Sequence, residues 1–91
     1  MAYAIVLDEE ARKLFLALDK SVREIIAKKL VQLEREDLQS RHLKVGVPVF
    51  VEETGQYRIA FKKREQEKQK LVVFVGDRKD YVKWYSSFFK N

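Results

Sequence analysis

Two stretches of sequence decide the fold: Gln56-Tyr57-Arg58-Ile59-Ala60-Phe61 and, after a charged interval, Leu71-Val72-Val73-Phe74-Val75-Gly76-Asp77-Arg78. The first alternates between two kinds of side chain, which indicates a strand with one face on the core. The second begins as an unbroken apolar run, which is typical of a buried central strand. Strands that follow each other along a chain usually lie side by side, so Arg58 and Arg78 could lie on neighbouring strands. Aromatic residues follow at once, and arginines beside aromatic rings are what recognition of RNA or phosphate requires.

The N-terminal part predicts a strand and two helices. Residues 3–7 (YAIVL) are short, apolar and β-branched, which favours a strand. Asp8 can cap a following helix, in which apolar residues recur at helical spacing as far as Leu18. Ser21-Val22-Arg23-Glu24 reads as a capping box that opens a second helix, ending near Glu36. Two helices this close in sequence should form an antiparallel hairpin.

The remainder predicts strands and a short terminal segment. Residues 37–44 read as a polar connection, residues 47–51 as a strand with Pro48 at its start or at an edge, and Thr54-Gly55 as a turn. The charged run 62–70 (KKREQEKQK) is interpreted as a hairpin loop. Residues 81–89 are rich in aromatics and predict a helical turn or two.

Together these elements predict an α+β fold in a single domain over residues 1–91. The N-terminal strand and the αα hairpin would pack on one face of a mainly antiparallel four-stranded sheet. Tyr57, Ile59 and Phe61 should face the helices. The other face should remain open and carry Arg58 and, by the pairing above, Arg78.

Composition limits the possible functions. The chain has no cysteine, which excludes disulfides, thiol nucleophiles and zinc–cysteine sites. Its net charge of +5 suits an anionic partner. Residues 1–40 carry 7 basic and 8 acidic side chains, whereas residues 41–91 carry 12 and 6, so the positive field belongs to the second half. Because no signal peptide or long apolar run is visible, we expect a cytoplasmic protein.

The pattern resembles a known family. A leading strand, an αα hairpin, then LK-G-P around Lys44, G-YR- around Arg58 and VVFVGDRKDY ending at Tyr81 are similar to the RelE/ParE superfamily of bacterial and archaeal toxins. The resemblance covers nearly the whole chain. It implies an antitoxin protein as partner. For RelE-type members it implies binding in the ribosomal decoding site and cleavage of mRNA, with no metal or other cofactor.

The resemblance also implies roles for particular residues. Arg58 and Arg78 match two arginines that hold the scissile phosphate, and Lys44 matches a basic residue that contacts RNA. A catalytic tyrosine near the C-terminus corresponds to Tyr81 or Tyr85, while strict spacing from Arg78 falls on Trp84. The neighbouring basic residues Arg41, Lys62 and Lys63 are further candidates for RNA contacts.

The sequence departs from the RelE pattern at Glu52 and Glu53, where RelE enzymes carry lysines. This departure leaves open a rearranged active site using Tyr85 or Lys62, a weak nuclease, or a non-nuclease member. The last would be a ParE-like inhibitor of DNA gyrase or a catalytically silent member that only binds RNA or protein. Arg58 could then be a structural partner of Glu52 or Glu53. A basic RNA-binding domain without toxicity is a third alternative. His42 is the single histidine, so metal binding is not expected, and a role as a lone acid or base is conceivable.

Overall fold

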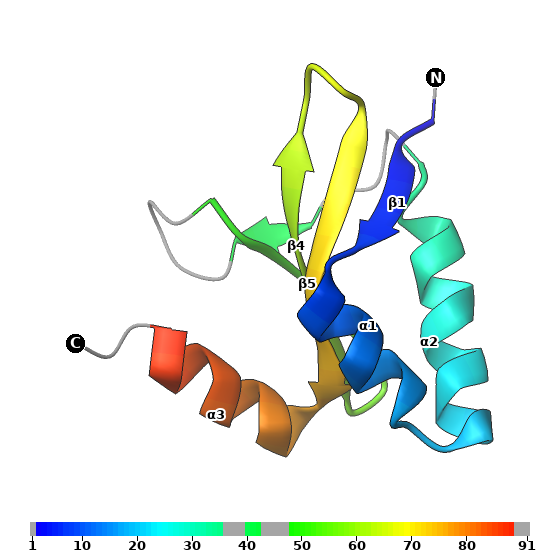
Figure 1. The fold of residues 1–91 in the computed structure, drawn as a ribbon, viewed down its shortest axis with the longest axis vertical. Helices are drawn as coiled ribbons and strands as arrows, with labels where there is room; N and C mark the ends of the chain where they lie inside the picture. Colours follow the sequence, from blue (N-terminus) through cyan, green and yellow to red (C-terminus); the bar gives the residue numbers. More distant parts are fainter. Residues whose placement is uncertain (1, 36–39, 43–47, 89–91) are drawn as a thin grey trace.

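The computed structural model describes residues 2–35, 40–42 and 48–88. These ranges contain three helices and five strands, whose arrangement is drawn in Figure 1. In chain order they are β1 (Ala4–Leu7), α1 (Glu9–Leu16), α2 (Lys20–Gln32), β2 (Arg41–His42), β3 (Phe50–Thr54), β4 (Tyr57–Arg64), β5 (Gln69–Asp77) and α3 (Arg78–Phe88). None of the helices in these ranges is long and apolar enough to span a membrane.

The strands form one mixed sheet in the order β1-β5-β4-β3-β2. β1 runs parallel to β5, and the other three neighbouring pairs are antiparallel. The predicted α+β fold with a mainly antiparallel sheet is therefore confirmed. The four expected strands correspond to β1, β3, β4 and β5. The two-residue β2 adds a fifth strand at the edge, within the stretch interpreted as a polar connection.

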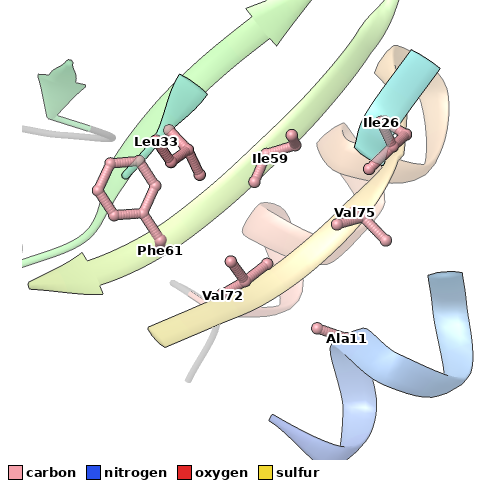
Figure 2. Close-up of a cluster of buried hydrophobic side chains, with 7 residues drawn as sticks. All are labelled: Ala11, Ile26, Leu33, Ile59, Phe61, Val72 and Val75. Atoms are coloured by element: carbon pink, nitrogen blue, oxygen red, sulfur yellow. The ribbon is translucent and has the colours of Figure 1, made fainter. Parts of the chain in front are cut away.

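The main core lies between the sheet and the helices α1 and α2. Figure 2 shows its seven buried side chains, which come from both helices and from the two central strands: Ala11, Ile26, Leu33, Ile59, Phe61, Val72 and Val75. Tyr57 is half-buried and packs against this cluster. The prediction that Tyr57, Ile59 and Phe61 face the helices is therefore correct.

The opposite face of the sheet is not open as predicted, because α3 packs on part of it. A second cluster of buried residues joins Val49, Ala60 and Phe74, and Tyr81 and Trp84 of α3 pack against it. Figure 1 shows α3 on the other side of the β4–β5 pair from α2. The aromatic segment that the sequence predicted as one or two turns is an eleven-residue helix. It covers apolar side chains that the strands expose on this face.

The two N-terminal helices begin differently from each other. Asp8 caps α1 as predicted, because its Oδ1 accepts a hydrogen bond of 2.8 Å from the N–H of Ala11. The predicted capping box at Ser21 is wrong, since α2 already begins at Lys20 and Asp19 has the extended backbone of its N-cap. The Arg23 guanidinium, which donates to the carbonyls of Leu16 and Leu18, holds the start of α2 against the end of α1. The helix ends at Gln32, before the expected Glu36.

The charged run 62–70 is mostly strand rather than loop. β4 continues to Arg64 and β5 starts at Gln69, so only residues 65–68 form the turn. Two lysines of this run lie over aromatic rings: the Nζ of Lys63 lies 4.6 Å from the Phe50 ring centroid, and the Nζ of Lys70 lies 4.7 Å from that of Tyr3. Long basic side chains can cover apolar surface with their methylenes and bind aromatic faces with their charge. A charged sequence can therefore form the outer part of the β4–β5 hairpin.

The expected strand 47–51 is also displaced along the chain. β3 begins at Phe50 and ends at Thr54, and Val47 lies outside the described residues. Gly55 then takes a positive φ of 61°, a conformation that glycine adopts without steric cost. The predicted turn at Thr54-Gly55 is confirmed, and it fixes how β3 and β4 pair.

Candidate functional site

Arg58 lies near the start of β4, on the sheet face that α3 partly covers. It pairs in register with Gly76 on β5 and with Glu53 on β3. Its Nε is 3.6 Å from an oxygen of Glu53, and its NH1 donates to the carbonyls of Gly55 and Tyr57 at 3.2 and 3.1 Å. The side chain is 13% exposed. The guanidinium is thus held against the β3–β4 turn, with one carboxylate beside it.

The two glutamates that depart from the RelE pattern point to opposite faces of the sheet, because successive strand residues alternate. Glu52 pairs with Ile59, on the α1–α2 side, and its carboxylate is 3.2 Å from the Nζ of Lys29. The hydroxyl of Ser40 also donates to this carboxylate. Glu53 alone shares the face of Arg58. Of the two salt bridges considered for Arg58, the structure therefore contains the one with Glu53.

Arg78 is the first residue of α3 and lies just beyond β5, rather than on the strand as predicted. Its backbone N–H donates to the carbonyl of Gln56 at 2.8 Å. Gln56 belongs to the same β3–β4 turn whose Gly55 carbonyl binds the Arg58 guanidinium. The structure therefore brings both predicted arginines to one end of the β4–β5 pair, on either side of a single turn.

The side chain of Arg78 is exposed and lines a groove of about 640 Å³, here named the α3 groove. The groove runs between the β3–β4 turn and the first two turns of α3. Its lining residues are Gln56, Asp77, Arg78, Lys79, Val82 and Lys83. Lys79 and Lys83 were not among the residues predicted from the sequence. Their spacing of four residues within a helix was the signal available, since it places two cations on one helical face.

The aromatic residues of α3 mainly hold the helix on the sheet. The Trp84 ring stacks on Phe74 with a centroid separation of 5.1 Å, and the Tyr81 ring lies 6.0 Å from Phe74. Tyr85 is exposed and its ring lies 5.5 Å from that of Tyr81. Of the two predicted catalytic tyrosines, Tyr81 is thus half-buried in the packing, whereas Tyr85 presents its side chain to solvent.

The predicted RNA-binding lysines lie on different faces. Lys62 is exposed on β4 and, by alternation along the strand, shares the face of Arg58. Lys63 points to the other face, where its charge lies over the ring of Phe50. Arg41 and His42 form β2, in register with Val51 and Phe50. Lys44 lies outside the described residues.

The buried cation Lys70 lies beside Lys63, on the neighbouring strand β5. Lys70 has no exposed surface, and its Nζ donates to the carbonyl of Arg35 at 3.4 Å. Burial lowers the pKa of Lys70, and the neighbouring charge of Lys63 lowers this pKa further. In the described ranges, no group of three or more histidine, cysteine or acidic residues is placed to hold a metal ion.

The fold matches solved structures of bacterial toxins. No protein-family model and no curated protein sequence matches the chain. The toxin in a RelBE toxin–antitoxin complex from Mycobacterium tuberculosis is 18% identical and superposes with a TM-score of 0.77, over 86% of this chain and all of that one. A variant of E. coli RelE in the free state is 26% identical with a TM-score of 0.75, over 93% of both chains. The same toxin bound to an antitoxin peptide is 26% identical with a TM-score of 0.72, over 100% of this chain and 98% of that one.

These matches span bacterial and archaeal toxins, since the RelE of Pyrococcus horikoshii in its RelB complex also superposes, with a TM-score of 0.63 at 16% identity. In each case nearly the whole of both chains is covered, so the likeness concerns the complete domain and not one motif. The resemblance noted in the sequence is thus supported by the three-dimensional arrangement. This chain has the fold of the RelE toxins.

Proposed function

We propose that this protein is the toxin of a type II toxin–antitoxin system and cleaves mRNA on the ribosome, in the cytoplasm. The observation that carries the proposal is the placement of Arg58 and Arg78 around one turn of a RelE fold. The structural neighbours include RelE toxins, both free and in complexes with RelB antitoxins, which supports an antitoxin as partner.

The proposed chemistry uses the 2′-hydroxyl of the RNA as nucleophile. Its oxygen attacks the adjacent phosphorus while the bond to the 5′-oxygen of the next nucleotide breaks, which leaves a 2′,3′-cyclic phosphate. Negative charge builds on the phosphate oxygens in the transition state. Guanidinium groups stabilise such charge with paired, charge-assisted hydrogen bonds, and this is the role proposed for Arg58 and Arg78.

Proton transfer needs a base for the 2′-hydroxyl and an acid for the leaving oxygen. Of the two tyrosines predicted for such a role, Tyr85 is the better placed to meet a substrate, because its side chain reaches solvent. Tyr81 is held between Phe74 and Tyr85 and would support the position of α3. We therefore assign proton transfer to Tyr85 and packing to Tyr81.

The proposal is tested by inducing the protein in bacteria and reading growth and the 5′ ends of cellular mRNA together. We expect growth arrest with new cleavage sites inside translated codons. Arg58→Ala/Arg78→Ala should abolish both, and either single variant should slow cleavage about 100-fold or more, since one lost transition-state donor costs this much. Lys13→Ala/Lys28→Ala removes the same charge from exposed positions on α1 and α2 and should leave cleavage intact. Cleavage that survives in a folded arginine double variant contradicts the assignment.

A second candidate function is inhibition of DNA gyrase, as in the ParE branch of the superfamily. The observation that favours it is Glu53, which places a carboxylate beside Arg58 where an mRNA phosphate would approach. Growth arrest accompanied by DNA breaks, with mRNA left uncut, would identify this function.

A further inference from the structure

The α3 groove carries more positive charge than the two predicted arginines account for. It contains Arg78, Lys79 and Lys83 against a single carboxylate, that of Asp77, which leaves a net charge of +2. Asp77 is already engaged, because its Oδ1 accepts a hydrogen bond of 2.8 Å from the backbone N–H of Asp80. The groove is therefore electrostatically suited to an anion.

The three cations of the α3 groove are not explained by ion pairs with the described part of the chain. Within the ranges that the structure describes, no carboxylate lies within ion-pairing distance of the side chains of Arg78, Lys79 or Lys83. What sets these cations apart is their grouping in one groove, whereas Lys29 binds Glu52 and Lys63 lies over an aromatic ring. Cations gathered in one groove without carboxylate partners are a feature of a binding surface for an anion.

The shape of the groove favours a strand over a single small anion. Its volume of about 640 Å³ far exceeds that of one phosphate ion. Val82 lines it as an apolar residue, 47% exposed, and Gln56 of the β3–β4 turn also lines it. Lys79 and Lys83 are one helical turn apart, with Cβ atoms about 5–6 Å from each other. This spacing is comparable to that of successive phosphates along a nucleic-acid strand.

Arg78 links this groove to the reaction, because it lines the groove and is also the proposed ligand of the scissile phosphate. Lys79 and Lys83 line the same groove, so a strand held there can place a neighbouring phosphate beside them. We infer that Lys79 and Lys83, with Gln56, bind the phosphodiesters of single-stranded RNA next to the phosphate held by Arg78. This inference rests on the proposed function and extends its substrate site along α3.

The test measures binding separately from cleavage. A short, fluorescein-labelled single-stranded RNA with every 2′-hydroxyl methylated cannot be cut, and its affinity is followed by fluorescence polarisation over a range of KCl concentrations. The variant Lys79→Ala/Lys83→Ala is compared with Lys13→Ala/Lys28→Ala, which has the same net charge. Far-UV circular dichroism and thermal unfolding show that each variant is folded.

We expect Lys79→Ala/Lys83→Ala to weaken RNA binding by about tenfold or more near 0.1 M salt. The slope of log affinity against log salt should become shallower by about 1.4, because each phosphate contact on a single strand contributes about 0.7. The control pair should change affinity only slightly and leave the slope near that of the wild type. Gln56→Ala should weaken binding without altering the slope, since the lost amide carries no charge.

Two results would overturn the inference. In the first, the groove variant and the control variant have the same affinity and the same slope. In the second, RNA binding is unchanged while binding of fluorescein-labelled poly-glutamate is lost in Lys79→Ala/Lys83→Ala, which would assign the groove to an acidic protein partner. Failure of the proposed function is recognised separately, as absence of mRNA cleavage by the wild type, because the polarisation assay uses RNA that cannot be cut.

Discussion

Single residues decide how the acidic departure from the RelE pattern should be interpreted. Glu52 and Glu53 are neighbours in sequence but act on different faces of the sheet. Glu52 bonds to Lys29 of α2 with both side chains largely covered, at 12% and 17% exposure, whereas Glu53 is 44% exposed beside Arg58. The first glutamate is therefore part of the helix–sheet packing, and only the second can influence an anion at Arg58.

Glu53→Gln should strengthen RNA binding severalfold and change stability little. The carboxylate repels a phosphate that approaches Arg58, and an exposed ion pair contributes only about 0–1 kcal/mol to folding. Polarisation with the uncleavable RNA measures the first effect and urea unfolding the second. If RNA affinity falls instead, Glu53 orients the Arg58 guanidinium rather than competing for it.

Glu52→Gln is the matched comparison and should behave in the opposite way. It leaves the charge of Lys29 in a largely covered position without its carboxylate, which should cost about 1–3 kcal/mol of unfolding free energy. RNA affinity should stay at the wild-type value, because Glu52 faces away from Arg58. Equal effects of the two substitutions on RNA binding would contradict the assigned faces.

Lys70 gives the stability a pH dependence of known sign. Burial, then the charge of Lys63, lower its pKa in the folded state below the ordinary value of 10.5, while Glu52 and Glu65 oppose this. Between the lowered pKa and 10.5 the unfolded chain binds more protons, so unfolding free energy rises with pH there. The unfolding free energy of the wild type minus that of Lys70→Met, measured by urea titration, should therefore increase between pH 7.5 and pH 10. A difference that is flat or decreases would mean that Lys70 keeps an ordinary pKa or a raised one.

At the scale of elements, Gly76 controls how α3 docks on the sheet. A Cβ at this position would lie 2.8 Å from the Cζ of Phe74, the ring on which Trp84 stacks. Gly76→Ala should displace that ring and lower stability by about 1–3 kcal/mol, the usual cost of overpacking. Because Trp84 is the single tryptophan of the chain, its fluorescence should shift towards that of an exposed indole.

Gly55→Ala is the control that separates displacement of the Phe74 ring from the effect of backbone strain. Gly55 has a positive φ of 61° and no atom within 4 Å of the added Cβ, so alanine there is strained but collides with nothing. We expect a stability loss of about 1 kcal/mol with the Trp84 emission unchanged. An emission shift as large in Gly55→Ala as in Gly76→Ala would show that the fluorescence reports global loosening and not the docking of α3.

The sequence predicted which helices and strands form better than it predicted the residues at which they begin and end. Apolar periodicity located α1, α2 and the central strands, because these elements bury one face or both. It misjudged the start of α2, where Arg23 bonds to the end of α1, and the run 62–70, where lysines pack on aromatic rings. Both errors have one cause: the deciding contacts lie outside the segment itself. Local sequence patterns contain no information about such tertiary contacts.

At the scale of the whole molecule, the site depends on pairings that periodicity does not specify. The sequence predicted only that the two arginines could lie on neighbouring strands. Two features could be seen only in the structure. One is the strand register that places Glu53, and not Glu52, beside Arg58, and the other is the packing of α3 over Phe74. The basic second half was recognised from charge counts, but the grouping of Lys79 and Lys83 with Gln56 depends on a turn 23 residues before Lys79.

The two hydrophobic clusters predict a hierarchy of stability across the molecule. Among the described residues, seven buried ones join β4 and β5 to α1, α2 and the C-cap of α2, whereas Val49, Ala60 and Phe74 form the buried cluster beneath α3. Because less apolar surface holds it, α3 should open without unfolding of the sheet, as weakly packed elements do.

Native-state hydrogen exchange with added denaturant should show amides of α3 exchanging at a lower free energy than those of β5. Gly76→Ala should widen this gap, because it disturbs the ring on which α3 rests while leaving the main core in place. Exchange of both elements at one common free energy would mean that α3 unfolds only together with the sheet.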